Sequence, residues 1–346
     1  MKTADFDYKL PPELIAQFPC EERDGCRLLC LDRKSGKVSH QTFKELSGLL
    51  SPGDLLVFNN TKVIPARLFC LKKTGGKVEL LLTGPSSGNS WNALVRPGTG
   101  CKAGEMLRLI KDESVVIKIT AVNPDGTREV SLISDDGQKS LIDIIKNFGV
   151  MALPHYIRRP AVSQDSVTYQ TVYARQEGAI ASPTAGLHFT HELMDALAER
   201  GIGISYVTLH VGIGTFKPVT AEDPRDHIMH EEAYELTKEA AAQIARTKER
   251  GGRVIAVGTT SVRVLEHCAK DGGPIQASSG KTALIILPGY EFRVIDGMIT
   301  NFHVPKSTLL MLVSTFAGRE AVLAAYRNAV ADGYRFFSYG DAMLIL

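Results

Sequence analysis

Histidines and hydroxyl side chains gather in glycine-rich segments near the middle of the chain. The segment GAIASPTAGLHFT holds Thr184 and His188 in a loop rich in Gly and Pro, which ends at Thr190, the predicted N-cap of a helix. Backbone N–H groups of such a loop can bind a polar or anionic ligand. A capped helix start without any ligand explains the same residues equally well, so the spacing alone leaves both interpretations open.

His210 ends a predicted strand in TLHVGIGTF. Alternation along a strand places Tyr206, Thr208 and His210 on one face, so the histidine has polar neighbours. Binding and catalytic residues commonly follow the ends of regular elements. The polar face therefore favours a functional histidine slightly over a structural one.

The segment HIMHEE places His227 and His230 three residues apart, with Glu231 adjacent. Two imidazoles at this spacing share a face of a helix, as metal ligands do. The segment lacks the wider spacing and the central Glu of HExxH, and it therefore indicates a general base or a substrate contact rather than a metal site. The cysteines form no CxxC pair, so we expect no metal site from them either.

Three further segments place polar residues after predicted strands or before predicted helices. RVIAVGTTSVR contains neither a P-loop nor GxGxxG, and its Thr259, Thr260 and Ser261 are predicted to cap a helix. The other two are FNNTKVIPARL, with Asn59, Asn60, Thr61 and Lys62, and ITNFHVPKSTLL, with Asn301, His303 and Lys306 before a helix capped by Ser307. Both are more typical of binding loops than of solvated linkers.

Tyrosines and arginines lie close together in YIRRP and YQTVYAR. Aromatic rings and guanidinium groups suit stacked bases and phosphates. An exposed basic edge without a partner explains them about equally well. The net charge of +2 neither requires nor excludes nucleic acid, because local patches matter more than the total.

The composition is that of a globular protein, with 44% hydrophobic and 23% charged residues among 346. This length predicts two domains, or one large domain with an insertion. No run of 18 apolar residues is present, so we expect no membrane span, and the first residues lack the apolar run of a signal peptide. Six scattered cysteines are typical of a protein in the reducing cytoplasm.

Short strands separated by turn signals fill residues 67–136. They are LFCLKK, KVELLL, NALVRP, EMLRLI, SVVIKIT and REVSLIS, and they predict a small antiparallel barrel, closed by a helix over residues 139–148. Strands and helices alternate elsewhere, which predicts α/β layers. We therefore predict a discontinuous, barrel-like α/β main domain made of residues 1–65 and 151–346, with an antiparallel β-barrel domain inserted at residues 66–150.

The predicted elements of the main domain follow from periodicity and from cap signals. The strands are Arg27–Leu31, residues 54–58, ISYVTLHV, RVIAVG, LIIL and YRFFSYG. The helices are THELMDALAERG, residues 237–250, TTSVRVLEHC, STLLMLVSTF and REAVLAAYRNAV.

Taken together, these segments resemble the S-adenosylmethionine:tRNA ribosyltransferase-isomerase family of queuosine biosynthesis. The resemblance runs almost end to end and is carried by LPPELIAQFP, RDGCRLL, LLVFNNTKVIPARL, YQTVYA, GAIASPTAGLHFT, TLHVGIGTFKPV, HIMHEE, GGRVIAVGTTSVR, ILPGYEFRVIDGMITNFHVPKSTLLMLVSTFAG and RFFSYGDAMLI. Two positions depart from the family pattern. His155 stands in place of a proline, and Cys26 stands where a serine is frequent.

The resemblance implies an enzyme that transfers and isomerises the ribosyl group of S-adenosylmethionine to 7-aminomethyl-7-deazaguanine at the wobble position of a tRNA. The product would be epoxyqueuosine, with adenine and methionine released; adenosylmethionine is a substrate, and no cofactor is implied. The implied enzyme is cytoplasmic and monomeric and binds no membrane. The implied catalytic residues are His188, His210, His230 and Glu231, and the implied substrate-binding residues are Arg23, Asp24, Asn60, Lys62, Thr184, Thr260, Arg263, His303 and Lys306.

Two other functional classes are compatible with the same motifs. A metal-dependent hydrolase would use His210, His227 and His230 and would carry stoichiometric zinc or manganese. A non-enzymatic RNA-binding module would bind RNA in a salt-dependent way and consume no adenosylmethionine. The long polar loops argue against the second class, because a binding module needs no such cleft.

Overall fold

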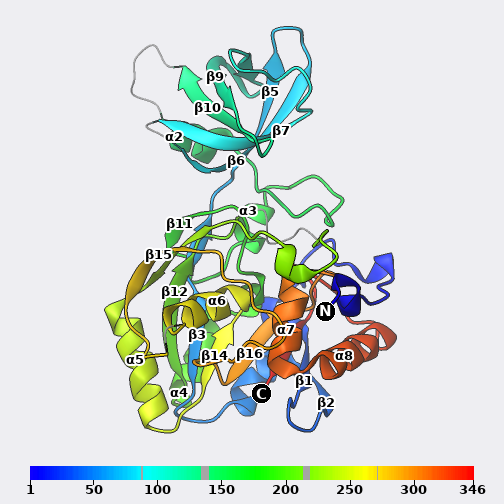
Figure 1. Ribbon diagram of the computed structural model, residues 1–346, viewed down its shortest axis with the longest axis vertical. Coiled ribbons are helices and arrows are strands. Elements are labelled where there is room, and N and C mark those ends of the chain that lie inside the picture. Colours follow the sequence, from blue (N-terminus) through cyan, green and yellow to red (C-terminus); the bar gives the residue numbers. More distant parts are fainter. Residues whose placement is uncertain (87–88, 134–139, 213–218, 271) are drawn as a thin grey trace. The chain divides into compact units, whose positions relative to one another are not determined.

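The computed structural model of the chain is shown in Figure 1. It describes residues 1–86, 89–133, 140–212, 219–270 and 272–346. The chain divides into two compact units, one made of Met1–Lys62, Pro154–Arg159 and Thr168–Leu346, the other of Val63–Leu153 and Pro160–Val167. The predicted boundaries were 65/66 and 150/151, and residues 160–167 were predicted in the main domain.

The second unit contains a closed barrel of six antiparallel strands. Its strands are β5 (Arg67–Lys72), β6 (Lys77–Pro85), β7 (Ser90–Arg96), β8 (Met106–Leu109), β9 (Asp112–Val122) and β10 (Arg128–Ile133), paired in the order β10-β7-β6-β5-β8-β9. Alternate residues of β6, Val78, Leu80 and Leu82, are buried, as expected for a strand with one face inside a barrel. The six predicted strands are confirmed, and the predicted helix is present as α2 (Leu141–Phe148); residue 139, where that helix is predicted to begin, lies outside the described residues.

Gly149 ends α2 at a point where no side chain fits. A Cβ atom there would lie 1.9 Å from the carbonyl oxygen of Pro65 and 2.5 Å from that of Ile145. The close approach requires glycine, and it fixes the end of the helix against the start of the barrel segment.

The first unit is built on one sheet of nine strands. The order is β15 (Ser278–Thr282), β13 (Glu232–Leu236), β12 (Gly203–Leu209), β3 (Leu55–Asn59), β14 (Val254–Val257), β16 (Gly297–Asn301), β17 (Ala342–Ile345), β1 (Arg27–Leu31) and β2 (Val38–Thr42). Strands β12, β3, β14 and β16 are parallel, so their carboxyl ends meet at one edge of the sheet. Every residue of β3, β14, β16 and β17 is buried, which explains their apolar sequences.

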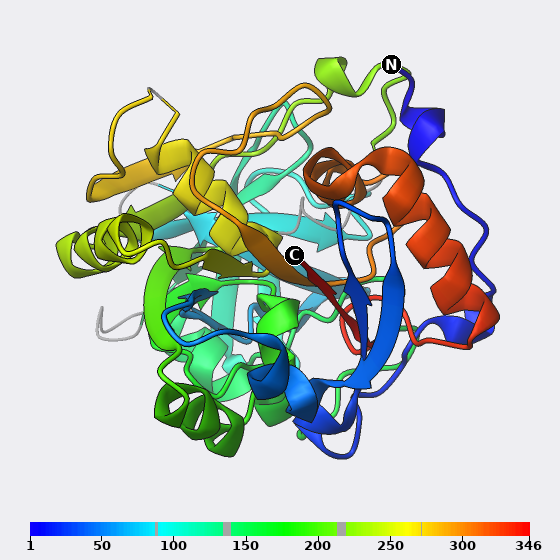
Figure 2. The ribbon, with the colours of Figure 1, turned by 90° about the horizontal axis from the view of Figure 1, so that it is seen from below.

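Helices cover both faces of this sheet. Figure 2 shows α5 (Lys238–Glu249) and α6 (Thr259–Cys268) on one side of the sheet and α4 (His191–Glu199) on the other. The remaining elements are α1 (Leu46–Leu49), α3 (Asp165–Thr168), α7 (Thr308–Ala317), α8 (Arg319–Ala331), the two-stranded sheet of β4 (Thr61–Val63) and β11 (Gln176–Ala179), and the 3₁₀ helices η1 (Thr3–Phe6), η2 (Pro12–Leu14), η3 (Arg23–Gly25), η4 (Phe43–Glu45), η5 (Thr184–His188) and η7 (Pro224–Asp226). The predicted α/β class with an inserted antiparallel barrel is confirmed.

The predicted caps are correct at two helices and wrong at a third. Thr190 Oγ accepts the N–H of Leu193, and Ser307 Oγ accepts that of Leu310. The N-cap of α6 is instead Gly258, without a side-chain cap, and Ser261 Oγ donates to the carbonyl of Val257. Gly258 has φ +86, a conformation that favours glycine over a threonine or serine cap.

Two predicted strands near the C-terminus are wrong. LIIL (284–287) has no regular structure, and the strand lies before it, at β15. YRFFSYG is a turn, because Phe337 has φ +71, which no strand accommodates. The sequence prediction also missed β16 and β17, which are short, fully buried and preceded by turn residues.

Among the described residues, no single helix is long and apolar enough to cross a membrane. Helices α7 and α8 pass that test of length and composition only as a pair, and the pair is bent by 113°.

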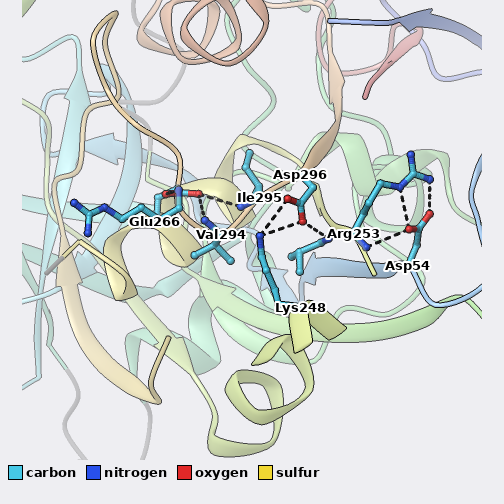
Figure 3. Close-up of polar contacts among 9 residues, drawn as sticks. Asp54, Lys248, Arg253, Glu266, Val294, Ile295 and Asp296 are labelled. Atoms are coloured by element: carbon cyan, nitrogen blue, oxygen red, sulfur yellow. Dashed lines mark hydrogen bonds and ion pairs between the residues drawn. The ribbon is translucent and has the colours of Figure 1, made fainter. Parts of the chain in front are cut away.

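Three carboxylates fasten the amino ends of the central strands, as Figure 3 shows. Asp54, just before β3, accepts from Arg253 Nη2 at 2.6 Å and from its Nε at 3.0 Å. Asp296, just before β16, accepts the N–H of Val254 at 2.8 Å. Glu266 on α6 is fully buried and accepts the backbone N–H groups of residues 293–295 at 2.9–3.2 Å. These contacts set the positions of the parallel strands at the edge opposite their carboxyl ends.

Replacing Glu266 with Gln tests this anchoring. Gln keeps the shape but turns one acceptor oxygen into an N–H donor that faces backbone N–H groups. We expect the free energy of unfolding in urea to fall by about 2–3 kcal/mol. The matched control is Glu249→Gln at the exposed end of α5, where we expect a change below about 0.5 kcal/mol. Equal effects of the two changes would show that the Glu266 carboxylate does not hold the segment.

Candidate active site

A cavity lies at the carboxyl ends of β14 and β16. It encloses about 570 Å³, part of it open to solvent. Ligands of α/β proteins commonly bind at this edge of the sheet, where loops of several strands converge. The lining comes from η5 and the residues just before it, the first turn of α6, the end of β16 with the segment that leads into α7, the C-terminal turn, and two single residues, Tyr156 and Val211. The lining residues are Tyr156, Ser182, Pro183, Thr184, Ala185, Val211, Gly258, Thr259, Thr260, Thr300, Asn301, Phe302, His303, Val304, Ser307, Leu309, Phe337 and Ser338.

Two buried hydroxyl groups in this cavity are free to bind a ligand. Ser182 is 3% exposed and Thr260 is 6% exposed. Neither Oγ of Ser182 nor Oγ1 of Thr260 has a hydrogen-bond partner among the described residues. A buried polar group without a partner costs about 1–3 kcal/mol, so such groups commonly belong to binding sites. Thr260 also lies in the first turn of α6, where the helix dipole favours an anionic group.

The side chain of Asn301 holds the wall of the cavity together. Its Oδ1 accepts from Thr184 Oγ1 at 2.9 Å, and its Nδ2 lies 3.2 Å from His188 Nε2 and 3.1 Å from the carbonyl of Phe337. Because Nδ2 can only donate, Nε2 of His188 is the acceptor and the proton of this imidazole is on Nδ1. Nδ1 in turn lies 3.1 Å from the sulfur of Cys26.

His188 is buried behind this wall and is not among the lining residues. Burial lowers its pKa to about 3, so the imidazole is neutral at neutral pH. Its two nitrogens are occupied by Asn301 and Cys26. The structure therefore places His188 where it positions Asn301 and Thr184.

His303 is the one histidine among the described lining residues. Its Nε2 lies 2.7 Å from Thr300 Oγ1, and its backbone N–H donates to the hydroxyl of Tyr326 at 2.9 Å. Burial lowers the pKa of His303 to about 3, so it too is neutral at neutral pH.

His210 lies one residue before Val211, which lines the cavity. Its Nδ1 lies 2.8 Å from Thr61 Oγ1, and that hydroxyl also lies 3.4 Å from the carbonyl of Gln176, to which it donates. The hydroxyl then accepts from Nδ1–H, which leaves the lone pair of His210 on Nε2. Burial lowers the pKa of this imidazole. The arrangement suits a group that accepts a proton.

His230 and Glu231 lie outside the described lining of the cavity. Glu231 is exposed and forms an ion pair of 3.6 Å with Lys281. Among the described residues, the group close enough to hold a metal ion is Cys20, Cys26 and Asp341, and neither His227 nor His230 belongs to it.

The remaining predicted binding residues have partners within the protein. Arg23 donates to the carbonyl of Leu187, Asp24 accepts from Thr190, Asn60 accepts from Thr208, Lys62 pairs with Glu177, Lys306 pairs with Asp7, and the buried Arg263 pairs with Glu232. Of the predicted site residues, the cavity brings together Thr184, Thr260 and His303. The roles predicted for the others stay predictions.

The predicted catalytic and binding residues do not include Ser182, Tyr156 or Ser338, although Ser182 lies in the predicted ligand-binding loop and Tyr156 in the segment rich in tyrosine and arginine. Ser182 lies two positions before Thr184, so the motif that carries Thr184 already signals it. Tyr156 OH lies 2.6 Å from Ser338 Oγ, but the two residues are 182 positions apart, and no local pattern connects them.

The sequence profile of the queuosine biosynthesis protein family matches residues 3–345. The chain belongs to this family. It is 50% identical over 349 residues to the S-adenosylmethionine:tRNA ribosyltransferase-isomerase of Desulforamulus reducens and 51% identical over 348 residues to that of Moorella thermoacetica, with 100% of each chain covered in both cases.

A solved relative of the queuosine biosynthesis family has a similar fold. The crystal structure of the S-adenosylmethionine tRNA ribosyltransferase of Thermotoga maritima is 41% identical and has a TM-score of 0.57. It covers 99% of this chain, and this chain covers 100% of it. The family membership therefore rests on the full length of the chain rather than on isolated motifs.

Removing a cavity hydroxyl that has a hydrogen-bond partner should lower the free energy of unfolding more than removing one that has none. Thr184→Val removes a donor to Asn301, and we expect it to lower the free energy of unfolding by about 1–2 kcal/mol. Thr260→Val and Ser182→Ala remove hydroxyls without described partners, and we expect them to leave that free energy unchanged or to raise it. Urea unfolding without added ligand measures all three. A loss for Thr260→Val as large as for Thr184→Val would contradict a ligand-facing hydroxyl.

Proposed function

We propose that the chain is an S-adenosylmethionine:tRNA ribosyltransferase-isomerase. It transfers and isomerises the ribosyl group of S-adenosylmethionine to 7-aminomethyl-7-deazaguanine at the wobble position of a tRNA. The products are epoxyqueuosine in the tRNA, adenine and methionine. The observation that carries this proposal is the full-length match, at about half identity, to relatives that bear this name.

The reaction begins at the sulfonium of adenosylmethionine, which acidifies the hydrogens on C5′. A base removes one of these hydrogens and leaves an ylide. The aminomethyl group of the modified base attacks C1′ and adenine leaves. The C5′ carbanion then bonds to C1′ as the C1′–O4′ bond breaks, and the freed O4′ alkoxide closes the epoxide by displacing methionine from C5′. Adenosylmethionine is thus consumed as a substrate, and we propose that no further cofactor takes part.

The cavity suits the adenosylmethionine part of this reaction. The methionine carboxylate would lie at the first turn of α6, where Thr260 Oγ1 and the helix dipole both favour an anion. Ser182 Oγ would bind a second polar group of the same substrate.

His210 is the base that the geometry favours among the four predicted catalytic residues. Nδ1–H is held by Thr61, and Nε2 carries a lone pair with no partner among the described residues. It adjoins the cavity through Val211, whereas both nitrogens of His188 are occupied and Glu231 pairs with Lys281. A catalytic imidazole needs this combination of a fixed ring and an available nitrogen.

The partners follow from the same reaction. We propose that the tRNA carries the modified base at the wobble position when it binds, and that the enzyme acts as a monomer in the cytoplasm without a membrane partner. The six cysteines are free thiols, as in proteins of a reducing compartment.

Product analysis tests the function. Incubation with adenosylmethionine and tRNA bearing 7-aminomethyl-7-deazaguanine should release adenine and methionine in equal amounts, measured by mass spectrometry. Release should cease when the tRNA carries unmodified guanine at that position. Formation of S-adenosylhomocysteine would instead identify a methyltransferase and refute the proposal.

His210→Ala tests the base. We expect turnover to fall by about 10²–10⁴-fold, the usual contribution of a general base. The dissociation constant of adenosylmethionine should change by less than about threefold, because proton transfer acts on the transition state. The control is His155→Ala. His155 is exposed and departs from the family pattern, and we expect this variant to keep full activity. Full activity of a folded His210→Ala variant would place the base elsewhere.

A further inference from the structure

Two cysteines meet next to the wall of the cavity but belong to no step of the proposed reaction. Cys20 and Cys26 lie on either side of the short segment that contains η3, and their sulfur atoms lie within 4.8 Å of each other. Cys20 Sγ accepts from Arg335 Nη2 at 2.8 Å. Both cysteines are free thiols, with Cys20 partly exposed and Cys26 buried.

Asp341 completes this group, but its oxygen atoms are already occupied. Oδ1 accepts the N–H of Arg27 at 3.0 Å, and Oδ2 accepts that of Arg335 at 2.8 Å. The guanidinium of Arg335 also points at Cys20. A metal cation would therefore face a fixed positive charge and a carboxylate already bound to two N–H groups, so these residues suit a thiolate better than a cation.

The two thiols are chemically unequal. The hydrogen bond from Cys26 and the charge of Arg335 lower the pKa of Cys20 to about 7, against the effect of its burial. The same hydrogen bond and burial raise the pKa of Cys26. At neutral pH, Cys20 is therefore the thiolate of the pair, and Cys26 keeps its proton.

We propose that Cys20 and Cys26 are a hydroperoxide-sensitive pair that closes to a disulfide and thereby loosens the His188–Asn301 wall of the cavity. This inference goes beyond the proposed function, because it concerns a covalent modification that the transfer reaction does not use. The pair is a nucleophilic thiolate with a second thiol within reach, which is the arrangement of reversible thiol oxidation.

The chemical step balances with a hydroperoxide as the oxidant. The Cys20 thiolate attacks the terminal oxygen of the hydroperoxide and the O–O bond breaks. A sulfenic acid forms, and the departing alkoxide (or hydroxide) takes a proton from the solvent and leaves as an alcohol (or water). The Cys26 sulfur then attacks the Cys20 sulfur, and the hydroxyl leaves with the proton of Cys26 as water. The two thiols together lose two electrons, which the hydroperoxide gains.

The disulfide would act on the cavity through His188. Its sulfur atoms must come to about 2.05 Å from each other, so the Cys26 sulfur has to move toward Cys20. That sulfur accepts the Nδ1–H of His188, whose Nε2 holds the amide of Asn301. Its movement leaves a buried N–H without this partner, which disfavours the closed wall and the position of Thr184 on Asn301.

The disulfide should also be reversible. It closes a loop of only a few residues, and short loops gain little stability from a cross-link. Mild thiol reagents should therefore open it again.

Peptide mapping of the full chain tests the modification itself. The reduced protein is treated with hydrogen peroxide, blocked with an alkylating reagent and cut with trypsin, which cleaves after Arg23 and so separates the two cysteines. We expect a disulfide-linked peptide pair from Cys20 and Cys26. We also expect Cys20 to react at least about tenfold faster at pH 7 than Cys30, a partly buried thiol whose pKa burial raises to about 11.

Variants and reduction test the link to the cavity. Peroxide should lower the affinity for adenosylmethionine about threefold or more in the wild type, with full recovery after dithiothreitol. Cys20→Ser should be insensitive, whereas Cys30→Ser should respond like the wild type. Because mapping needs no turnover, the disulfide is tested even if the proposed transfer reaction is absent.

Three results would overturn the inference. One is oxidation of Cys20 to sulfinic acid without a bond to Cys26. Another is a reaction of Cys20 no faster than that of Cys30. The third is stoichiometric zinc in the untreated protein that is lost in Cys20→Ser, which would make the group a metal site. If Cys20→Ser does not fold, two measurements on the wild-type protein still test the inference. They are the peptide mapping of the Cys20–Cys26 disulfide and the comparison of the reaction rates of Cys20 and Cys30.

Discussion

The buried amide of Asn301 is the interaction on which the candidate site depends. Asn301 is the last residue of β16, and its amide binds Thr184 at the start of η5, His188 at the end of η5 and the carbonyl of Phe337 in the C-terminal turn. Thr184 and His188 lie more than a hundred residues before Asn301 in the chain, and Phe337 lies 36 residues after it. A side-chain amide with both donors and its oxygen used fixes all of them in one orientation, and a buried network of this kind tolerates no unpaired member.

The sheet explains why these segments converge. The parallel strands β12, β3, β14 and β16 send their following loops to one edge, whereas the ion pair of Asp54 with Arg253 and the bond from Val254 to Asp296 hold the other edge (Figure 3). Strand β17 runs antiparallel to β16, so the turn before β17 returns to the edge where β16 ends. The C-terminal turn therefore joins the cavity only because one strand reverses direction.

The sequence predicts the elements that have a periodic hydrophobic pattern, and it misses the elements whose structure depends on tertiary contacts. The barrel strands β6 and β9 alternate buried residues with more exposed ones, and the barrel strands are separated by turn residues, so their period is visible locally. Strand β16 is buried on both faces and only five residues long, so its segment resembles a loop. For the site, motifs single out Thr184, Thr260 and His303, but periodicity cannot tell that His188 faces Cys26 rather than the cavity.

The electrostatics of the cavity bear directly on the proposed chemistry. The described lining contains no Asp, Glu, Lys or Arg, and His303 is neutral because burial lowers its pKa to about 3. A carboxylate beside the sulfonium would stabilise the cation and oppose the loss of a C5′ proton, which turns that cation into a neutral ylide. A wall of hydroxyl groups and a neutral imidazole leaves the sulfonium charge uncompensated in a low-dielectric site, where it acidifies its neighbours most strongly. A neutral base such as His210 accepts the C5′ proton without placing a negative charge beside the sulfonium, as a carboxylate would. The acidifying effect of the sulfonium is therefore preserved.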